Sequence, residues 1–188
     1  FVLGNLHGKS IICANGRFHY YEGYKYQDVA IIIDVFKALG CEYVIMTNAS
    51  GSIVKEWHVG NLMLINGHLD YSFMQSNQNP RVITDERYSP KLLNKIKKMA
   101  NGLNIILREG IYTWTTGPSY ETPAEIRNIK SLGGHCVGMS GLPEIDRIFD
   151  LNMKMIGLCC LTNYASGMSR GELTHKEVVQ IAQDSQKQ

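Results

Sequence analysis

The stretch Tyr43-Val44-Ile45-Met46-Thr47-Asn48-Ala49-Ser50-Gly51-Ser52 indicates the fold class of this 188-residue chain. Its first five residues are mostly aromatic, β-branched or apolar, which is typical of a β-strand. The small and polar residues at 48–52 then predict a turn. Elsewhere, short apolar runs of the same kind alternate with amphipathic stretches. That alternation predicts an α/β fold in which a mixed central β-sheet is flanked by helices.

The same alternation of apolar runs and amphipathic stretches predicts the other elements along the chain. Strands are expected at 10–14, 62–65, 110–116, 136–139 and 155–162. Helices are expected at 27–39, 90–100, 143–151, from Thr122 to a stop at Gly133, and from Thr174 onward. Thr122 and Glu125 have the spacing of a capping box, and Gly40 is a typical helix stop. Asn15-Gly16 is a strong hairpin-turn signal.

Composition excludes several classes of protein. The 19 Lys and Arg residues against 17 Asp and Glu residues give a net charge of +2, too balanced for a dedicated nucleic-acid binder. No apolar run approaches the roughly 20 residues of a membrane span. The five cysteines are irregularly spaced and the six histidines are scattered, which indicates a reduced, intracellular protein without a zinc site. We expect one domain over residues 1–188, and the absence of a start methionine suggests a chain that opens inside a longer gene product.

Unusual polar segments fall at the ends of predicted strands, at 48–52, 117–122, 138–141 and 163–164. In open α/β sheets, ligands bind beyond the carboxyl ends of the strands. Each segment alone is more typical of a tight turn than of a ligand site. Their shared position therefore carries the prediction of a ligand site.

Arg17 and His19 are candidates for anion binding. They are two residues apart, so both side chains point to the same face of an extended segment. A guanidinium matches the oxygens of phosphate, and an imidazole adds one more donor. The backbone amide of Ala49 and the hydroxyl of Ser140 would complete such a site. An exposed hairpin carrying ordinary polar residues is the alternative.

Five segments together resemble one known family, the trimeric purine nucleoside phosphorylases. Residues 15–24 resemble its GRFHxYEGY signature, and 47–52 its TNAxGx turn. Residues 117–122 are similar to GPSxET, 138–144 to GMSxxPE, and Thr162-Asn163 to a TN pair. The segments occur in the family's order from one end of the chain to the other.

The resemblance implies a nucleoside-phosphorylase-like fold and the phosphorolysis of purine nucleosides (inosine, guanosine and their deoxy forms) in purine salvage. The products would be the free purine and ribose 1-phosphate. Inorganic phosphate would be the co-substrate, with no cofactor and no metal. It also implies a cytoplasmic homotrimer that binds neither nucleic acid nor membrane.

The resemblance also assigns roles to individual residues. Phosphate would be held by Arg17, His19, the amide of Ala49 and Ser140. Ribose would meet Tyr21, Met139 and, at its 5′-hydroxyl, His175. The base would face Tyr120 and bind Glu121 and Asn163, and the catalytic residues would be Asn163, Glu121 and His19.

Physical chemistry supports a preference for 6-oxopurines. An ionised Glu121 accepts the N1–H of such a base, whereas adenine presents a lone pair there, a mismatch of about 1–3 kcal/mol. Asn163 can rotate its amide to serve N7 or O6, and it stabilises the negative charge on the departing purine. The related methylthioadenosine phosphorylases usually carry aspartate at the position of Asn163 and lack the histidine matched by His175.

Three departures from the family keep other functions open. The family's opening segment, with its phosphate-binding loop, has no counterpart here, the chain skips a loop between Arg87 and Tyr88, and the last helix stops early at Gln188. The alternatives are a methylthioadenosine phosphorylase, a non-catalytic purine-binding remnant and a nucleosidase that hydrolyses its substrate. Neither of the last two needs a phosphate site, so Arg17, His19 and Ser140 argue against both.

From the local sequence alone, several of these residues are equally consistent with ordinary structural roles. His175 reads as an exposed first-turn residue, Asn163 as a turn asparagine, Glu121 as part of a helix cap, and Met139 as core. His58 and His68 have no role in the resemblance and are predicted to be structural.

Overall fold

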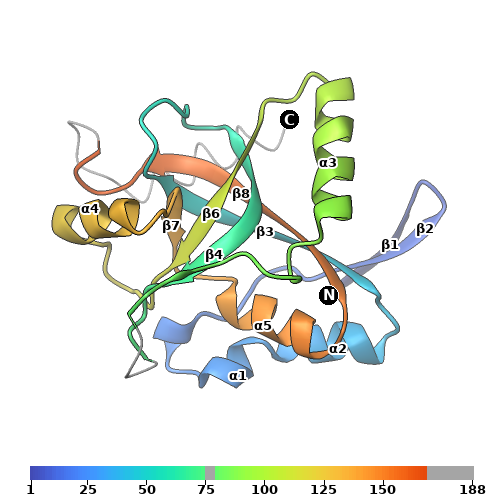
Figure 1. Cartoon of the computed structure of the whole chain (residues 1–188). Coiled ribbons are helices and arrows are strands. Elements are labelled where there is room, and N and C mark those ends of the chain that lie inside the picture. Colours follow the sequence, from blue (N-terminus) through green and yellow to red (C-terminus); the bar gives the residue numbers. More distant parts are fainter. Residues whose placement is uncertain (75–78, 169–188) are drawn as a thin grey trace.

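The computed structural model describes residues 1–74 and 79–168. Within them, six strands form a mixed sheet in the order β5-β4-β6-β7-β3-β8, and a further pairing between β4 and β8 closes the sheet on itself (Figure 1). The strands are β3 Tyr43–Ser52, β4 Leu62–Asp70, β5 Val82–Ile83, β6 Leu107–Trp114, β7 Cys136–Gly138 and β8 Lys154–Tyr164. The expected α/β fold with a mixed central sheet is confirmed.

Helices flank this sheet. They are the 3-10 helix at Tyr20–Glu22, α1 Tyr26–Val29, α2 Ile31–Ala38, α3 Pro90–Gly102, α4 Pro123–Ser131 and α5 Leu142–Asp150. α1, α2 and α5 lie together beneath the sheet, while α4 lies at one end of it (Figure 1). The larger apolar cluster, which includes Ile33, Met46, Trp114 and Ile145, fills the space between the sheet and α2 and α5. A second cluster around Ile126 and Ile129 packs beneath α4.

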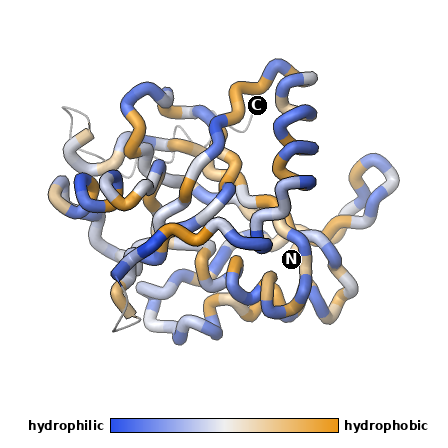
Figure 2. The backbone as a smooth tube through the Cα atoms, viewed as in Figure 1, coloured by the Kyte–Doolittle hydropathy of each residue, from blue (hydrophilic) through white to orange (hydrophobic). Residues whose placement is uncertain are grey.

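α3 carries the lysine-rich sequence expected to face solvent. Lys91, Lys95 and Lys98 are exposed, and Lys97 pairs with Glu109 at 2.7 Å. Figure 2 shows how hydrophilic this helix is compared with the strands beside it. The solvated face predicted from the sequence is confirmed.

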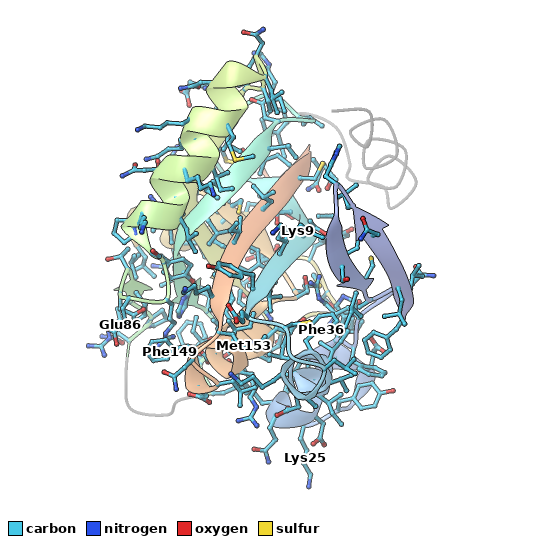
Figure 3. The ribbon with its side chains drawn as sticks, turned by 90° about the vertical axis from the view of Figure 1, so that its right-hand side faces the viewer. Lys9, Lys25, Phe36, Glu86, Phe149 and Met153 are labelled. Atoms are coloured by element: carbon cyan, nitrogen blue, oxygen red, sulfur yellow. The ribbon has the colours of Figure 1, made fainter. Side chains whose placement is uncertain are left out.

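The amino-terminal hairpin differs from the prediction. Strands β1 Val2–Leu6 and β2 Lys9–Cys13 pair antiparallel and turn at His7-Gly8, where φ is 48° and 76°. Two positive φ values are what a two-residue type I′ turn requires. The turn expected at Asn15-Gly16 is therefore wrong, since residues 14–19 form an irregular segment instead. Figure 3 shows this hairpin on one flank of the sheet and α3 on the other.

Two other elements also depart from the expectation. β3 continues to Ser52 through the predicted turn, because β8 pairs with it in parallel along its whole length, with a register shift after Ser50. The single helix expected at 27–39 is divided at Ala30, between α1 and α2.

The capping box at the start of α4 is confirmed. Thr122 Oγ1 accepts a hydrogen bond from the Glu125 amide, and Glu125 Oε2 accepts one from the Thr122 amide at 2.7 Å. The helix expected from Thr174, which includes His175, lies outside the described residues.

Candidate active site

The predicted site residues lie around one cleft of about 500 Å³. Its walls come from the irregular segment after β2, the ends of β3 and β8, and the segments that follow β6 and β7. They contain nine of the ten predicted residues: Arg17, His19, Tyr21, Ala49, Tyr120, Glu121, Met139, Ser140 and Asn163. The tenth, His175, is outside the described residues. Segments more than a hundred residues apart thus form one pocket.

The strands meet at this cleft in an unexpected way. β3 runs parallel to β8, but β7 runs antiparallel to β3, and Gly51 lies opposite Val137. The site is therefore not a simple row of parallel carboxyl ends. It forms where the last residues of β3 and β8 meet the segment that follows β7.

Arg17 provides the positive charge at one end of the cleft. Its Nη1 donates to the carbonyl of Thr47 at 3.0 Å, and its Nε lies 2.7 Å from Oε1 of Glu144. Glu144 is almost completely buried, and burial raises its pKa while the nearby guanidinium opposes that rise. A strand carbonyl and a buried carboxyl group therefore both hold the guanidinium.

His19 is held by Glu22 from the same segment. Glu22 Oε1 accepts the His19 amide at 2.8 Å and lies 2.9 Å from Nδ1 of the ring. These hydrogen bonds lower the pKa of Glu22. With Nδ1 donating to the carboxylate, Nε2 is the ring atom left for a ligand, and it donates to an anion when the ring is protonated. The ring stacks on Tyr21, with centroids 4.8 Å apart.

Ser140 is buried and lies two residues before the first residue of α5. The hydroxyl of Tyr112 donates to its carbonyl, and burial raises the Tyr112 pKa well above its usual value, so the phenol stays neutral as a donor. Gly141, with φ of 95°, then leads the chain into the helix. The backbone amides at the start of a helix favour anions. An anion bound by the Ser140 hydroxyl would therefore also be favoured by the nearby start of α5.

At the other end of the cleft, Glu121 is held by a threonine. Thr115 Oγ1 donates to Glu121 Oε1 at 2.6 Å, and Thr115 is itself buried. One oxygen of the carboxylate is thus oriented by the protein. Tyr120 is about half exposed beside it.

Asn163 has both ends of its amide engaged. Its Oδ1 accepts the hydroxyl of Thr162 at 3.0 Å, and its Nδ2 donates to the carbonyl of Tyr164 at 2.9 Å. Free rotation of this amide, which the sequence interpretation assumed, would break both hydrogen bonds. A Cβ on Gly51 would lie 3.0 Å from Nδ2, so the bare glycine backbone makes room for the amide.

Gly117 brings two further side chains of the cleft together. Its φ is 68°, and a Cβ there would lie 2.6 Å from Met139 Sδ and 2.8 Å from Tyr21 Cδ1. A side chain at this position would displace both. Met139 is consequently a cleft residue rather than the core residue that its local sequence suggests.

The residues that hold the cleft side chains in place were not predicted from the sequence. They are Glu22, Glu144, Thr115 and Thr162. Glu22 and Glu144 lie inside the quoted motifs, so their positions within those motifs were an available signal. Thr162 is the first residue of the quoted TN pair, whereas Thr115 lies outside the quoted motifs and nothing in its local sequence marks it.

Other features of the described chain lie apart from this cleft. A second cavity of about 490 Å³ contains none of the predicted residues and borders on His68, whose Nδ1 lies 2.6 Å from the hydroxyl of Tyr88. In the described part of the chain, no three His, Cys, Asp or Glu side chains are grouped so as to hold a metal ion. No helix there is long and apolar enough to cross a membrane.

The fold and the cleft define an α/β protein with a cationic corner beside a pocket lined by aromatic, amide and carboxylate groups. The chain belongs to the phosphorylase superfamily, whose family profile matches residues 1–188. Purine nucleoside phosphorylase 1 of Bacillus subtilis (strain 168) is 38% identical over 194 residues, which cover 97% of this chain and 70% of that protein. The Geobacillus stearothermophilus protein of the same name is also 38% identical, over 97% of this chain and 69% of its own length.

Solved structures agree with this assignment. The crystal structure of Schistosoma mansoni purine nucleoside phosphorylase in complex with adenosine has a TM-score of 0.88 and 26% identity, and the match covers 98% of this chain and 72% of that chain. The complex of the same enzyme with inosine has a TM-score of 0.86 and 26% identity, covering 97% and 70%.

Proposed function

We propose that this protein is a purine-nucleoside phosphorylase that converts inosine, guanosine and their deoxy forms to the free purine and the pentose 1-phosphate. Inorganic phosphate is the co-substrate. One observation carries the proposal above all. Nine residues, selected by motifs scattered along the chain, line one cleft of about 500 Å³. That volume suits a nucleoside together with an anion.

The phosphate would lie at the end of the cleft that holds Arg17, His19, the amide of Ala49 and Ser140. These groups supply a fixed guanidinium, an imidazole, a backbone N–H and a hydroxyl from three separate segments. Charge-assisted hydrogen bonds of this kind bind anions strongly.

The nucleoside would lie next to the phosphate, with its base at Glu121 and Asn163 and its sugar between Tyr21 and Met139. A phosphate oxygen attacks the anomeric carbon as the bond to purine N9 breaks, and the electron pair of that bond leaves with the base. Positive charge on the sugar is then close to the phosphate dianion. Negative charge on the purine is close to the second N–H of Asn163 Nδ2, a donor oriented before the reaction begins.

A preference for 6-oxopurines follows from the donors and acceptors at the base end. Thr115 already donates to Oε1 of Glu121, so the other oxygen is the acceptor for the N1–H of hypoxanthine or guanine. Assembly as a homotrimer, a cytoplasmic location and a contact between His175 and the 5′-hydroxyl rest on the resemblance to the family alone.

The test is to incubate the protein with inosine, with and without inorganic phosphate, and to quantify hypoxanthine and ribose 1-phosphate. Equimolar formation of both products, dependent on phosphate, is expected. Release of hypoxanthine and free ribose without phosphate would instead identify a nucleosidase. Binding of inosine without cleavage would identify a non-catalytic protein, and faster turnover of methylthioadenosine than of inosine would assign the sister activity.

A further inference from the structure

Glu144 is a buried carboxyl group directly behind the cationic corner of the cleft. It lies in the first turn of α5, is 1% exposed, and places Oε1 2.7 Å from Nε of Arg17. The contact is an ion pair rather than an aligned hydrogen bond. Among the described residues, Arg17 is the only cation within 4 Å of this carboxyl group.

Arg17 itself belongs to a segment that has no regular structure. Residues 14–19 lie between β2 and the 3-10 helix, whereas the two groups that hold the guanidinium belong to a strand and a helix. Thr47 in β3 accepts from Nη1, and Glu144 in α5 pairs with Nε. The third nitrogen, Nη2, makes no hydrogen bond to any residue that the structure describes. Two of the three guanidinium nitrogens are therefore held, and the arginine lines the cleft.

We propose that Glu144 is a positioning residue for the phosphate co-substrate: as a carboxylate it holds Nε of Arg17, so that Nη2 faces the anion. The proposal rests on the proposed function of the cleft. Glu144 is not among the described residues that line the cleft, so it acts through Arg17 rather than on the phosphate. Burial raises the pKa of Glu144, and the adjacent guanidinium opposes that rise because it stabilises the ionised form that this role needs.

Simple electrostatics gives the opposite expectation, and this makes the proposal testable. A negative carboxylate near the anion site repels phosphate, so its removal alone would tighten phosphate binding. Without the carboxylate, the guanidinium would instead rotate more freely. It would then lose more conformational entropy on binding phosphate and would bind it more weakly. The sign of the change in phosphate affinity decides between the two effects.

The first experiment compares wild type with Glu144→Gln, which keeps the side-chain volume and removes the charge. Initial rates are measured with phosphate and inosine varied independently, and binding of inorganic phosphate alone is measured by calorimetry. We expect the phosphate KM and Kd to rise about tenfold or more, while the inosine KM stays within about twofold. An unchanged or lower phosphate KM would overturn the proposal.

Asp34→Asn is the matched control. Asp34 on α2 pairs with Arg147 on α5, so this variant also removes an ion pair to the same helix, but away from the cleft. Both KM values should match wild type. A parallel rise in both KM values for Glu144→Gln, with a lower melting temperature, would show a structural role only.

A double-mutant cycle tests whether Glu144 acts through Arg17. In an Arg17→Ala background, Glu144→Gln should leave the phosphate KM unchanged, because the group that it positions is gone. A further tenfold rise in that background would overturn the positioning role. Should Glu144→Gln fail to fold, Glu144→Asp keeps the charge on a shorter side chain and should give an intermediate phosphate KM; a wild-type value there would contradict the proposal.

The two proposals fail in distinguishable ways. If wild type cleaves inosine with phosphate but Glu144→Gln binds phosphate as well as wild type, only the positioning role is lost. If wild type binds phosphate without cleaving inosine, and Glu144→Gln binds phosphate tenfold more weakly, only the catalytic function is lost. If wild type does not bind phosphate at all, both are wrong.

Discussion

Thr115 Oγ1 donates a hydrogen bond of 2.6 Å to Oε1 of Glu121, which joins the segment after β6 to the carboxylate proposed to bind the purine. The bond orients one carboxylate oxygen before any base is bound. Because Thr115 is buried, replacing its hydroxyl with a methyl group would leave Glu121 Oε1 without this donor.

Thr115→Val should therefore weaken recognition of the base. We expect kcat/KM for inosine to fall about tenfold, since a hydrogen bond to a charged group contributes about 1.5–3 kcal/mol, while the phosphate KM stays near wild type. Thr113→Val is a matched control, because the Thr113 hydroxyl is buried without a partner among the described residues. Equal losses in the two variants would argue against a role for the Thr115–Glu121 bond.

Asn163→Asp should shift the preference toward 6-aminopurines. The carboxyl oxygen that replaces Nδ2 can accept the N6–H of a 6-aminopurine, where the amide nitrogen could only donate, and in its protonated form it can still donate to the carbonyl of Tyr164 as Nδ2 does. The ratio of kcat/KM for adenosine to that for inosine should rise about tenfold, a change of about 1.4 kcal/mol. Asn128→Asp introduces the same charge on α4, away from the cleft, and should leave the ratio unchanged. A constant ratio in Asn163→Asp would remove Asn163 from base recognition.

Arg17→Ala should raise the phosphate KM far more than the inosine KM, by about tenfold to a hundredfold, because a charged donor to the anion is lost. It also leaves Glu144 buried beside no cation, which should lower the free energy of unfolding by about 3–5 kcal/mol. Kinetics with each substrate varied, together with urea denaturation, measures both effects. Arg147→Ala removes an arginine that lies outside the cleft lining and should leave the phosphate KM unaltered. Equal effects of Arg17→Ala on the two substrates would contradict an anion role.

Gly117→Ala should reduce activity more than its backbone strain alone explains. The new Cβ would meet Met139 Sδ at 2.6 Å and Tyr21 Cδ1 at 2.8 Å, so both side chains must move out of place. Gly8→Ala is the control, because Gly8 has a similar φ of 76° with no atom within 4 Å of the added Cβ. Both variants should lose about 1 kcal/mol of stability from the positive φ, but only Gly117→Ala should lose kcat/KM for inosine, by about tenfold or more. Wild-type kinetics in that variant would show that Met139 and Tyr21 do not depend on the close approach.

His68 should make stability depend on pH. Burial lowers its pKa from 6.5 to about 4, so the unfolded chain takes up a proton at a higher pH than the folded chain does. The stability due to neutral His68 is therefore complete above pH 6.5 and is lost as the pH falls toward 4. Between pH 7 and pH 5 this loss amounts to about 2 kcal/mol. Urea denaturation at the two pH values should show it, and His68→Gln should reduce it, whereas His58→Gln, at an exposed position, should not. An unchanged difference in His68→Gln would assign the pH dependence to other groups.

The residues of the cleft could be predicted because their motifs are contiguous. Residues 15–24 and 117–122 each carry several functional groups at fixed spacing, so a short stretch of sequence identifies them. The capping box of Thr122 and Glu125 was likewise readable, because all of its atoms lie within one helical turn. Such features depend on neighbours along the chain.

The supporting contacts could not be predicted in this way. Arg17 is 127 residues from Glu144 in sequence, and no local pattern pairs them. The extension of β3 through 48–52 also depends on a distant partner, because β8 supplies the hydrogen bonds that hold those small residues in a strand. Asn15-Gly16 has a strong local preference for a hairpin turn, but the segment that follows it does not pair with β2. The hairpin turn lies at His7-Gly8 instead, because β2 pairs with β1.

By itself, then, the sequence determined the α/β class, the family resemblance and the identities of nine residues that line the cleft, because periodicity and motif spacing are properties of short segments. Tertiary structure alone decided which nitrogens of the Arg17 guanidinium are held, which way the amide of Asn163 points, and where β3 ends. Each of these is set by hydrogen bonds or charges whose partners meet only after the sheet has closed, and folding brings them together whatever their separation in sequence.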